Sequence, residues 1–161
     1  MKVINIHKRE INQPKSEVAR LFSTLSSEND LMLATDKWPP MKLDKGLQVG
    51  SKGGHGPINY FVTDYQKDNS ITFQFDMSGF NGFHKFEILE IEQDKTQLKH
   101  TIAMATGGPA TIKWALAIRW LHDAYIEDAF DKVENYFTKD KKRSEWSWWV
   151  KTLRKIMNRK R

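Results

Sequence analysis

Three histidines lie where an imidazole could do chemistry inside an apolar pocket. His84 and His100 each alternate with apolar residues at the spacing of one strand face, and His122 follows Ile118 by four residues. The unperturbed pKa of histidine lies near neutrality, so a buried imidazole can act as a general base. Removal of a proton next to a carbonyl group, as a cyclase or dehydratase requires, would suit such a residue.

Other roles compete with catalysis for these histidines. A histidine on an apolar face is often a hydrogen-bonded core residue, and orienting the polar head group of a ligand ranks above catalysis here. His84, His100 and His122 are therefore candidates, and the catalytic residue stays unassigned. Asp76 or Asp123 could orient one of the rings. The histidines come from separate segments without a local pair of ligands, so we predict no metal site and no cofactor.

Aromatic and aliphatic side chains could form a pocket around these rings. The residues expected to contact a ligand are His55, Tyr60, Phe73, Phe75, Met77, Phe80, His84, Phe86, His100, Met104, Trp114, Ile118, Leu121, His122 and Tyr125. An ordinary packed core is the alternative, because spacing does not distinguish a filled core from a cavity. His55 is expected at the cavity mouth, and Phe80, between two glycines, could act as a gate.

The glycine-rich segment at residues 53–57 has two interpretations. It could be a phosphate-binding loop, but it lacks the Lys-Ser/Thr pair of a P-loop and leads into a strand. We therefore predict a hairpin turn in which glycine supplies the positive φ angles.

Hydrophobic periodicity predicts the elements that must position these residues. Residues 3–11 are expected to form a strand, the residues after Pro14 a helix, and residues 30–35 a short second helix. Period-two alternation predicts strands at residues 47–52, 58–65 and 71–77 and around His84 and His100.

Residues 110–137 are expected to form one long helix, because they contain neither Gly nor Pro. Apolar residues recur there at steps of three and four: Trp114, Ile118, Leu121, Tyr125, Ala129, Val133 and Tyr136. The pattern predicts an amphipathic helix with acidic residues along its polar side.

This order of elements resembles a known fold. A strand, a helix pair, several antiparallel strands and a long closing helix resemble the helix-grip fold of the START, birch-allergen-like and polyketide cyclase (SRPBCC) superfamily. The strand-to-helix step at residues 11–18 is similar to the usual entry of that family. Residues 53–60, with Trp38 and Pro39 before them and residues 82–87 after them, resemble an uncharacterised bacterial branch. The resemblance implies an α+β fold with a curved antiparallel sheet wrapped around a C-terminal helix.

The resemblance also implies a function. The cavity between sheet and helix would bind or transport a hydrophobic or amphipathic small molecule, such as a lipid, an isoprenoid or a polyketide-like compound. Members of the superfamily include carriers, receptors, cyclases and dehydratases, and a shared fold does not choose among them. A cyclase- or dehydratase-like enzyme that uses a cavity histidine as general base is therefore the alternative.

The positive charge of the chain is concentrated at its C-terminal end. Residues 1–138 carry a net charge of −2 and residues 139–161 a net charge of +8, which together give the +6 of the whole chain. We expect a ligand-binding domain at residues 1–138 and a basic tail helix at residues 139–161, which Ser144 could cap. The tail residues expected to meet a membrane or partner are Trp146, Trp149, Lys151, Leu153, Arg154 and Lys155.

Three roles are open for this tail. A basic amphipathic helix with Trp on its apolar face is typical of a protein that binds an anionic membrane surface. Packing of the tail on its own domain, or on the second subunit of a homodimer, is an equal alternative, and nucleic acid ranks third. The sequence has no cysteine, no signal-peptide-like stretch and no membrane-spanning segment. A cytoplasmic protein, peripheral to a membrane if the tail binds there, is the expectation.

Overall fold

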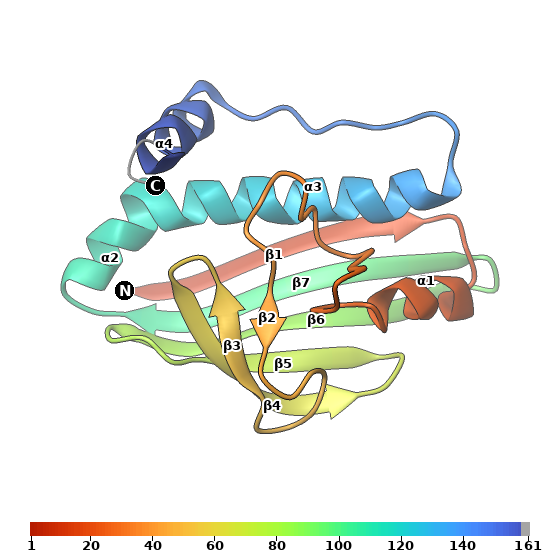
Figure 1. Ribbon diagram of the computed structural model, residues 1–161, viewed down its shortest axis with the longest axis horizontal. Coiled ribbons are helices and arrows are strands. Elements are labelled where there is room, and N and C mark those ends of the chain that lie inside the picture. Colours follow the sequence, from red (N-terminus) through yellow and green to blue (C-terminus); the bar gives the residue numbers. More distant parts are fainter. Residues whose placement is uncertain (159–161) are drawn as a thin grey trace.

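One curved antiparallel sheet wraps around a long helix in the computed structural model, which describes residues 1–158 (Figure 1). The strands are β1 (Lys2–Ile11), β2 (Lys42–Leu43), β3 (Lys52–His55), β4 (Ile58–Gln66), β5 (Ser70–Phe75), β6 (Phe80–Glu92) and β7 (Lys95–Thr106). The helices are α1 (Lys15–Phe22), α2 (Pro109–Lys113), the π-helical η1 (Trp114–Ile118), α3 (Arg119–Phe137) and α4 (Trp148–Asn158). The sheet order is β1-β7-β6-β5-β4-β3-β2. This is the predicted α+β arrangement.

The two long strands β6 and β7 carry two of the candidate histidines. They pair along most of their length, with Phe86 opposite His100 and His84 opposite Ile102. Alternate residues of each strand are buried beneath the helix, as the period-two pattern predicted. His84 and His100 therefore point to the same side of the sheet as the apolar residues that flank them.

Residues 30–35 form turns and not the predicted short helix. The carboxylate of Asp30, which is 5% exposed, accepts hydrogen bonds from the backbone N–H groups of Ser26, Met32 and Leu33. An aspartate that binds nearby backbone donors in this way stabilises a loop in competition with a helix.

The glycine-rich segment also differs from the prediction. Residues 47–51 form turns, and β3 contains Gly53, Gly54 and His55, which were expected in a turn. A Cβ atom at Gly53 or Gly54 would collide with a carbonyl oxygen of the neighbouring strand, so glycine permits the close pairing of β3 with β2 and β4. The turn itself is limited to Gly56, with a φ of 55°, and Pro57.

The closing helix is nearly continuous from Pro109 to Phe137, in agreement with the prediction, but it contains the π turn η1. Trp114, Tyr125, Ala129 and Val133 are buried on its inner face. Tyr136 was expected on that face and is 47% exposed instead. Its hydroxyl accepts weak hydrogen bonds from the guanidinium of Arg20 on α1.

The tail folds back over the outer side of the closing helix (Figure 1). The indole N–H of Trp146 donates to Asp128 at 2.7 Å, that of Trp149 donates to the carbonyl of Leu116 at 2.9 Å, and Val150 is buried. Ser147, and not the predicted Ser144, caps α4, because its hydroxyl accepts the backbone N–H of Val150. None of the helices within residues 1–158 is long and apolar enough to cross a bilayer.

Candidate ligand-binding cavity

A cavity of about 130 Å³ lies between the sheet and the closing helix. Most residues expected to contact a ligand line it: His55, Phe75, Met77, Phe80, His84, Phe86, His100, Trp114, Ile118, Leu121, His122 and Tyr125. The lining also contains residues that sequence reasoning missed: Trp38, Pro39, Met41, Gly56, Pro57, Ile58, Ile102, Ile126 and Met157. The Trp38-Pro39 pair was a signal for some of them, because a rigid aromatic segment between two elements often covers a core. Met157 comes from the tail, which the prediction treated as a separate unit.

Three of the expected contact residues lie outside the lining. Tyr60 is buried and its hydroxyl is 3.0 Å from Nδ1 of His55. Phe73 stacks on His84, with ring centroids 4.7 Å apart. Met104 packs in a second core cluster with Val3 and Phe80. These residues support the cavity wall from behind.

Four histidines reach the cavity from four different elements. His55 lies on β3, His84 on β6, His100 on β7 and His122 on α3. Nε2 of His100 is 3.3 Å from Nδ1 of His84, and the rings of His100 and His122 lie 4.9 Å apart. His55 stacks on Tyr125 with an interplanar angle of 10°. The fold thus brings the three candidate histidines together and adds His55.

All four cavity imidazoles are held in the neutral form. Burial lowers the pKa of His55 to about 4 and lowers the pKa values of His84 and His100 well below 6.5. Burial also lowers the pKa of His122, although Asp123 acts in the opposite direction. A protonated imidazole would lose its hydration shell in this apolar space, so the neutral form prevails at pH 7.

Several polar atoms of the cavity have no hydrogen-bond partner among residues 1–158. They are Nε2 of His84, Nδ1 of His100, both ring nitrogens of His122 and the hydroxyl of Tyr125. Buried polar atoms without partners cost about 1–3 kcal/mol each. Such a concentration of unpaired atoms in one place marks a site where a ligand could supply the missing partners.

The two carboxylates considered as orienting groups are placed differently. Oδ1 of Asp123 is 3.6 Å from Nδ1 of His122, too long for a good hydrogen bond but close enough for electrostatic attraction. Asp76 is exposed just after β5. Asp123 is therefore the carboxylate that could influence a cavity histidine.

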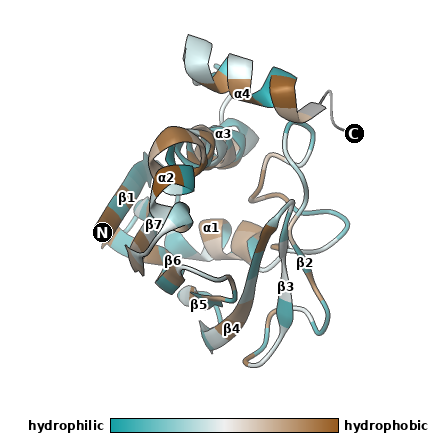
Figure 2. Cartoon of the chain, turned by 90° about the vertical axis from the view of Figure 1, so that its left-hand side faces the viewer, coloured by the Kyte–Doolittle hydropathy of each residue, from teal (hydrophilic) through white to brown (hydrophobic). Residues whose placement is uncertain are grey.

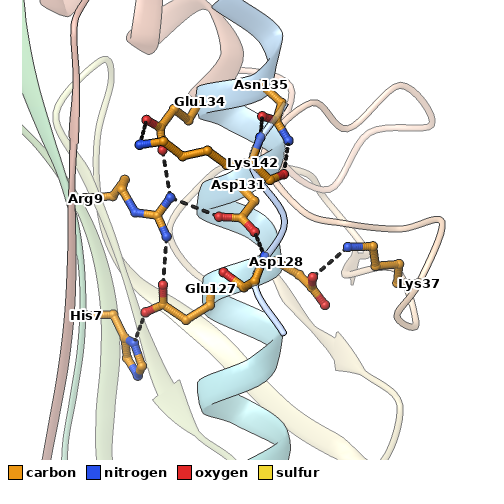
Figure 3. A network of polar contacts seen from close by, with 10 residues as sticks. His7, Arg9, Lys37, Glu127, Asp128, Asp131, Glu134, Asn135 and Lys142 are labelled. Atoms are coloured by element: carbon orange, nitrogen blue, oxygen red, sulfur yellow. Dashed lines mark hydrogen bonds and ion pairs between the residues drawn. The ribbon is translucent and has the colours of Figure 1, made fainter. Parts of the chain in front are cut away.

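A dense network of charges joins β1 to α3 (Figure 3). Arg9 on β1 donates hydrogen bonds to Glu127, Asp131 and Glu134 at 2.7–2.9 Å. His7 on the same strand contacts Glu127 at 2.7 Å and Asp123 at 3.1 Å. These acidic residues, which were expected along the polar side of the helix, thus bind side chains of β1.

His7 is charged in this network. Burial alone would lower its pKa, but the hydrogen bonds to Asp123 and Glu127 outweigh that effect and raise it to about 9. His7, His122 and Asp123 each bring one potential metal ligand within 4.8 Å of the others. Both nitrogens of His7 already bind carboxylates, so the imidazolium takes the place of a cation and we assign no metal to this group.

A buried carboxylate joins the tail to the cavity wall. Asp128 is 1% exposed and accepts hydrogen bonds from the indole N–H groups of Trp38 and Trp146, at 2.8 Å and 2.7 Å, and from Lys37 at 2.6 Å. The guanidinium of Arg154 lies over both indole rings, 4.1 Å and 4.4 Å from their centroids. Trp146 and Arg154, expected to meet a membrane or partner, are engaged within the chain.

The architecture and its cavity can be compared with known proteins. No protein-family model matches the sequence, and the search of curated proteins returns no match. Among solved structures, a protein from Nitrosospira multiformis superposes with a TM-score of 0.66 and 14% identity, covering 88% of this chain and 100% of that chain. Norcoclaurine synthase from Thalictrum flavum, solved with dopamine and hydroxybenzaldehyde, superposes with a TM-score of 0.64 and 11% identity, covering 87% of this chain and 90% of that chain. This chain has the helix-grip fold.

A third helix-grip neighbour extends the comparison to nearly the whole chain. A conserved protein of unknown function from Enterococcus faecalis gives a TM-score of 0.61 at 13% identity, covering 98% of this chain and 86% of that chain. At these identities the similarity establishes the fold and leaves the ligand and any reaction open.

Proposed function

We propose that this protein is a member of the START, birch-allergen-like and polyketide cyclase superfamily, from its uncharacterised bacterial branch, that binds an uncharged small molecule with a hydrophobic body and one hydroxyl or carbonyl group. The observation that carries the proposal is the apolar cavity in which three of the four neutral imidazoles, those of His84, His100 and His122, leave ring nitrogens unpaired. Neutral imidazole both donates and accepts hydrogen bonds, so it suits a hydroxyl or a carbonyl.

The lining also limits the charge and size of the ligand. Among residues 1–158 the lining contains no Lys, Arg, Asp or Glu, so burial of an ionic group there would be costly. A dry apolar cavity of about 150 Å³ accommodates benzene in another protein, so this cavity of about 130 Å³ suits a molecule with a single ring. The printed ligands of the norcoclaurine synthase structure, dopamine and hydroxybenzaldehyde, are of this size. An isoprenoid, lipid or polyketide would require Met157 and the tail to move outwards.

A matched pair of probes tests this proposal on the full chain. We expect p-cresol to bind with a lower dissociation constant than toluene, because only the phenol can pair with an imidazole nitrogen. Replacing His122 by phenylalanine should remove most of this preference, about tenfold or more, while toluene still binds. Isothermal titration and ligand-observed NMR measure both constants.

The control is Tyr65→Phe, which removes a hydroxyl from β4 outside the cavity lining. It should retain the preference for p-cresol. Failure of the wild-type chain to bind either probe at millimolar concentration, or an equal preference in His122→Phe, would contradict the proposal. Mass spectrometry of an organic extract of the purified protein then searches for the natural ligand.

Catalysis by His122 is the second candidate, because its ring lines the cavity beside Asp123. A lowered pKa keeps the imidazole neutral and able to accept a proton. It also makes the imidazole a weaker base, which favours binding over proton transfer. Exchange of the methyl hydrogens of acetophenone with deuterium from D₂O, followed by NMR, tests for proton abstraction. An exchange rate equal to that of buffer alone would exclude this chemistry for the probe.

A further inference from the structure

Large apolar side chains are exposed together where the tail meets the closing helix. Ile112 is 61%, Leu116 60% and Trp120 42% exposed, and they recur every four residues along α2, η1 and the start of α3. Trp148, the first residue of α4, is 75% exposed. We call these four residues and their basic neighbours Lys113, Arg119, Lys151 and Lys155 the α2–α4 surface.

A direct contact places α4 beside the closing helix at η1. The indole N–H of Trp149 donates to the carbonyl of Leu116 at 2.9 Å, and the ring of Trp148 lies 5.5 Å from that of Trp149. Figure 2 faces this end of the molecule and shows α4 beside α3, with α2 at the near end of the closing helix and apolar residues on both α2 and α4. The exposed residues therefore belong to one surface.

The charges around this surface are mainly positive. Residues 107–122 and 146–158 contain no Asp or Glu, and they contain five basic residues. Lys113, Arg119, Lys151 and Lys155 are exposed, whereas Arg154 lies over the rings of Trp38 and Trp146. Among the acids of α3, Asp123 and Glu127 are paired with His7, and Asp123 also lies 3.8 Å from the guanidinium of Arg119. The apolar residues thus have a basic rim.

We propose that the α2–α4 surface docks on an anionic lipid bilayer. Exposed Trp, Leu and Ile side chains would enter the interface, and the lysines and arginine would remain among the anionic head groups. Each basic residue near such a membrane contributes about a fivefold increase in partitioning. This assigns membrane contact to a surface composed mainly of the closing helix and Trp148, and not to Trp146 or Arg154.

The other side of the same segments forms the cavity wall. Trp114, Ile118 and Leu121 of the closing helix and Met157 of α4 line the cavity. A docked molecule would therefore exchange its ligand next to the bilayer. This consequence depends on the proposed ligand binding, whereas docking itself does not.

Vesicle sedimentation of the full chain, without added ligand, tests the docking. We expect binding to phosphatidylcholine vesicles that contain about one third phosphatidylserine, weak binding to pure phosphatidylcholine, and loss of binding at high salt. Leu116→Glu and Trp148→Glu should each lower the partition coefficient by about tenfold or more. The charge reversal Lys151→Glu with Lys155→Glu should have a similar effect on anionic vesicles only.

Matched variants on other surfaces control for general effects. Ile4 on β1 is 58% exposed, nearly as exposed as Leu116, so Ile4→Glu should bind vesicles like the wild type. Lys8→Glu with Lys67→Glu reverses two exposed charges outside the α2–α4 surface and should weaken binding less. Circular dichroism and urea unfolding confirm that each variant is folded.

Three outcomes would overturn the proposal. They are no binding of the wild type to anionic vesicles, equal binding of Leu116→Glu and Ile4→Glu, or self-association in analytical ultracentrifugation that Leu116→Glu abolishes while vesicles do not bind. The last result would assign the surface to a second copy of the chain. Binding of p-cresol is measured separately, so failure of docking and failure of ligand binding are distinguishable.

Discussion

His7 and His122 lie with ring centroids 5.7 Å apart, yet the structure holds them in opposite protonation states. His7 faces the carboxylates between β1 and α3 and is positively charged, whereas His122 faces the apolar cavity and is neutral. A region in which polar groups are paired thus lies directly beside a region in which they are not. The paired region can stabilise the fold, and the unpaired region remains available for a ligand.

The largest expected effect comes from breaking the paired region at its centre. Arg9→Met would remove the cation shared by Glu127, Asp131 and Glu134, and because the network is only partly buried we expect a loss of about 2–3 kcal/mol, at or below the lower end of the roughly 3–5 kcal/mol for a fully buried pair. Urea unfolding measures the loss. Arg20→Met removes an exposed guanidinium and should leave stability nearly unchanged. Equal losses in both variants would contradict this account of the network.

The second-largest expected effect is on the pH dependence of stability, which differs between the two regions. The folded-state pKa of His7 is raised to about 9, so its contribution is complete below pH 6.5 and is lost as the pH rises towards 9. A shift of this size corresponds to at most about 3 kcal/mol. His7→Gln should flatten this alkaline decrease in the unfolding free energy.

The cavity histidines act with the opposite sign. Their pKa values are lowered, that of His55 to about 4, so their contribution is present above pH 6.5 and is lost as the pH falls towards 4. His7→Gln should leave this acidic decrease in place. An unchanged alkaline decrease in His7→Gln would show that another group is responsible for it.

Replacing His122 by phenylalanine should have a smaller effect on stability, in the favourable direction. The substitution removes two buried nitrogens that have no partner among residues 1–158, and we expect a gain of about 1 kcal/mol in unfolding free energy. The same variant should lose the preference for p-cresol. A destabilisation of several kcal/mol would mean that His122 has a structural role.

The smallest effect is expected on the outer face of the sheet. Glu87 on β6 forms ion pairs with Lys85 and Lys99, each at 3.0 Å, and all three side chains are partly exposed to solvent. Glu87→Gln should cost about 0.5 kcal/mol, because solvated ion pairs contribute little. Thermal unfolding at low and high salt checks this, since the small loss should shrink further in salt.

Periodicity was sufficient to predict most of the fold. The alternation around His84 and His100 gave their strand faces correctly, and the steps of three and four residues gave the long helix. The prediction of a helix at residues 30–35 was wrong because one buried carboxylate, Asp30, determines a loop that propensity does not reveal. Gly53 and Gly54 of β3 were wrongly assigned to a turn, because glycine is favoured both in tight turns and where two strands pair closely.

The cavity was predicted less completely than the fold. Residues on regular elements could be placed by spacing, but Trp38 and Met157 reach the cavity from a loop and from the tail. Their positions depend on tertiary contacts with Asp128 and Leu116, which are distant in the sequence. The pairing of His7 with Asp123 was missed for the same reason.

The π turn at Trp114–Ile118 acts as a one-residue insertion in an otherwise regular helix. One residue rotates a helix by about 100°, so this turn sets the angular offset between Ile112 before it and Tyr125 after it. Deleting Ala115 or Ala117 would convert the turn to a regular one while every helical hydrogen bond could still form. The outward apolar row and the inward cavity wall would then fall out of phase, so deleting either alanine is a means of uncoupling the two surfaces without changing any of the residues named on them.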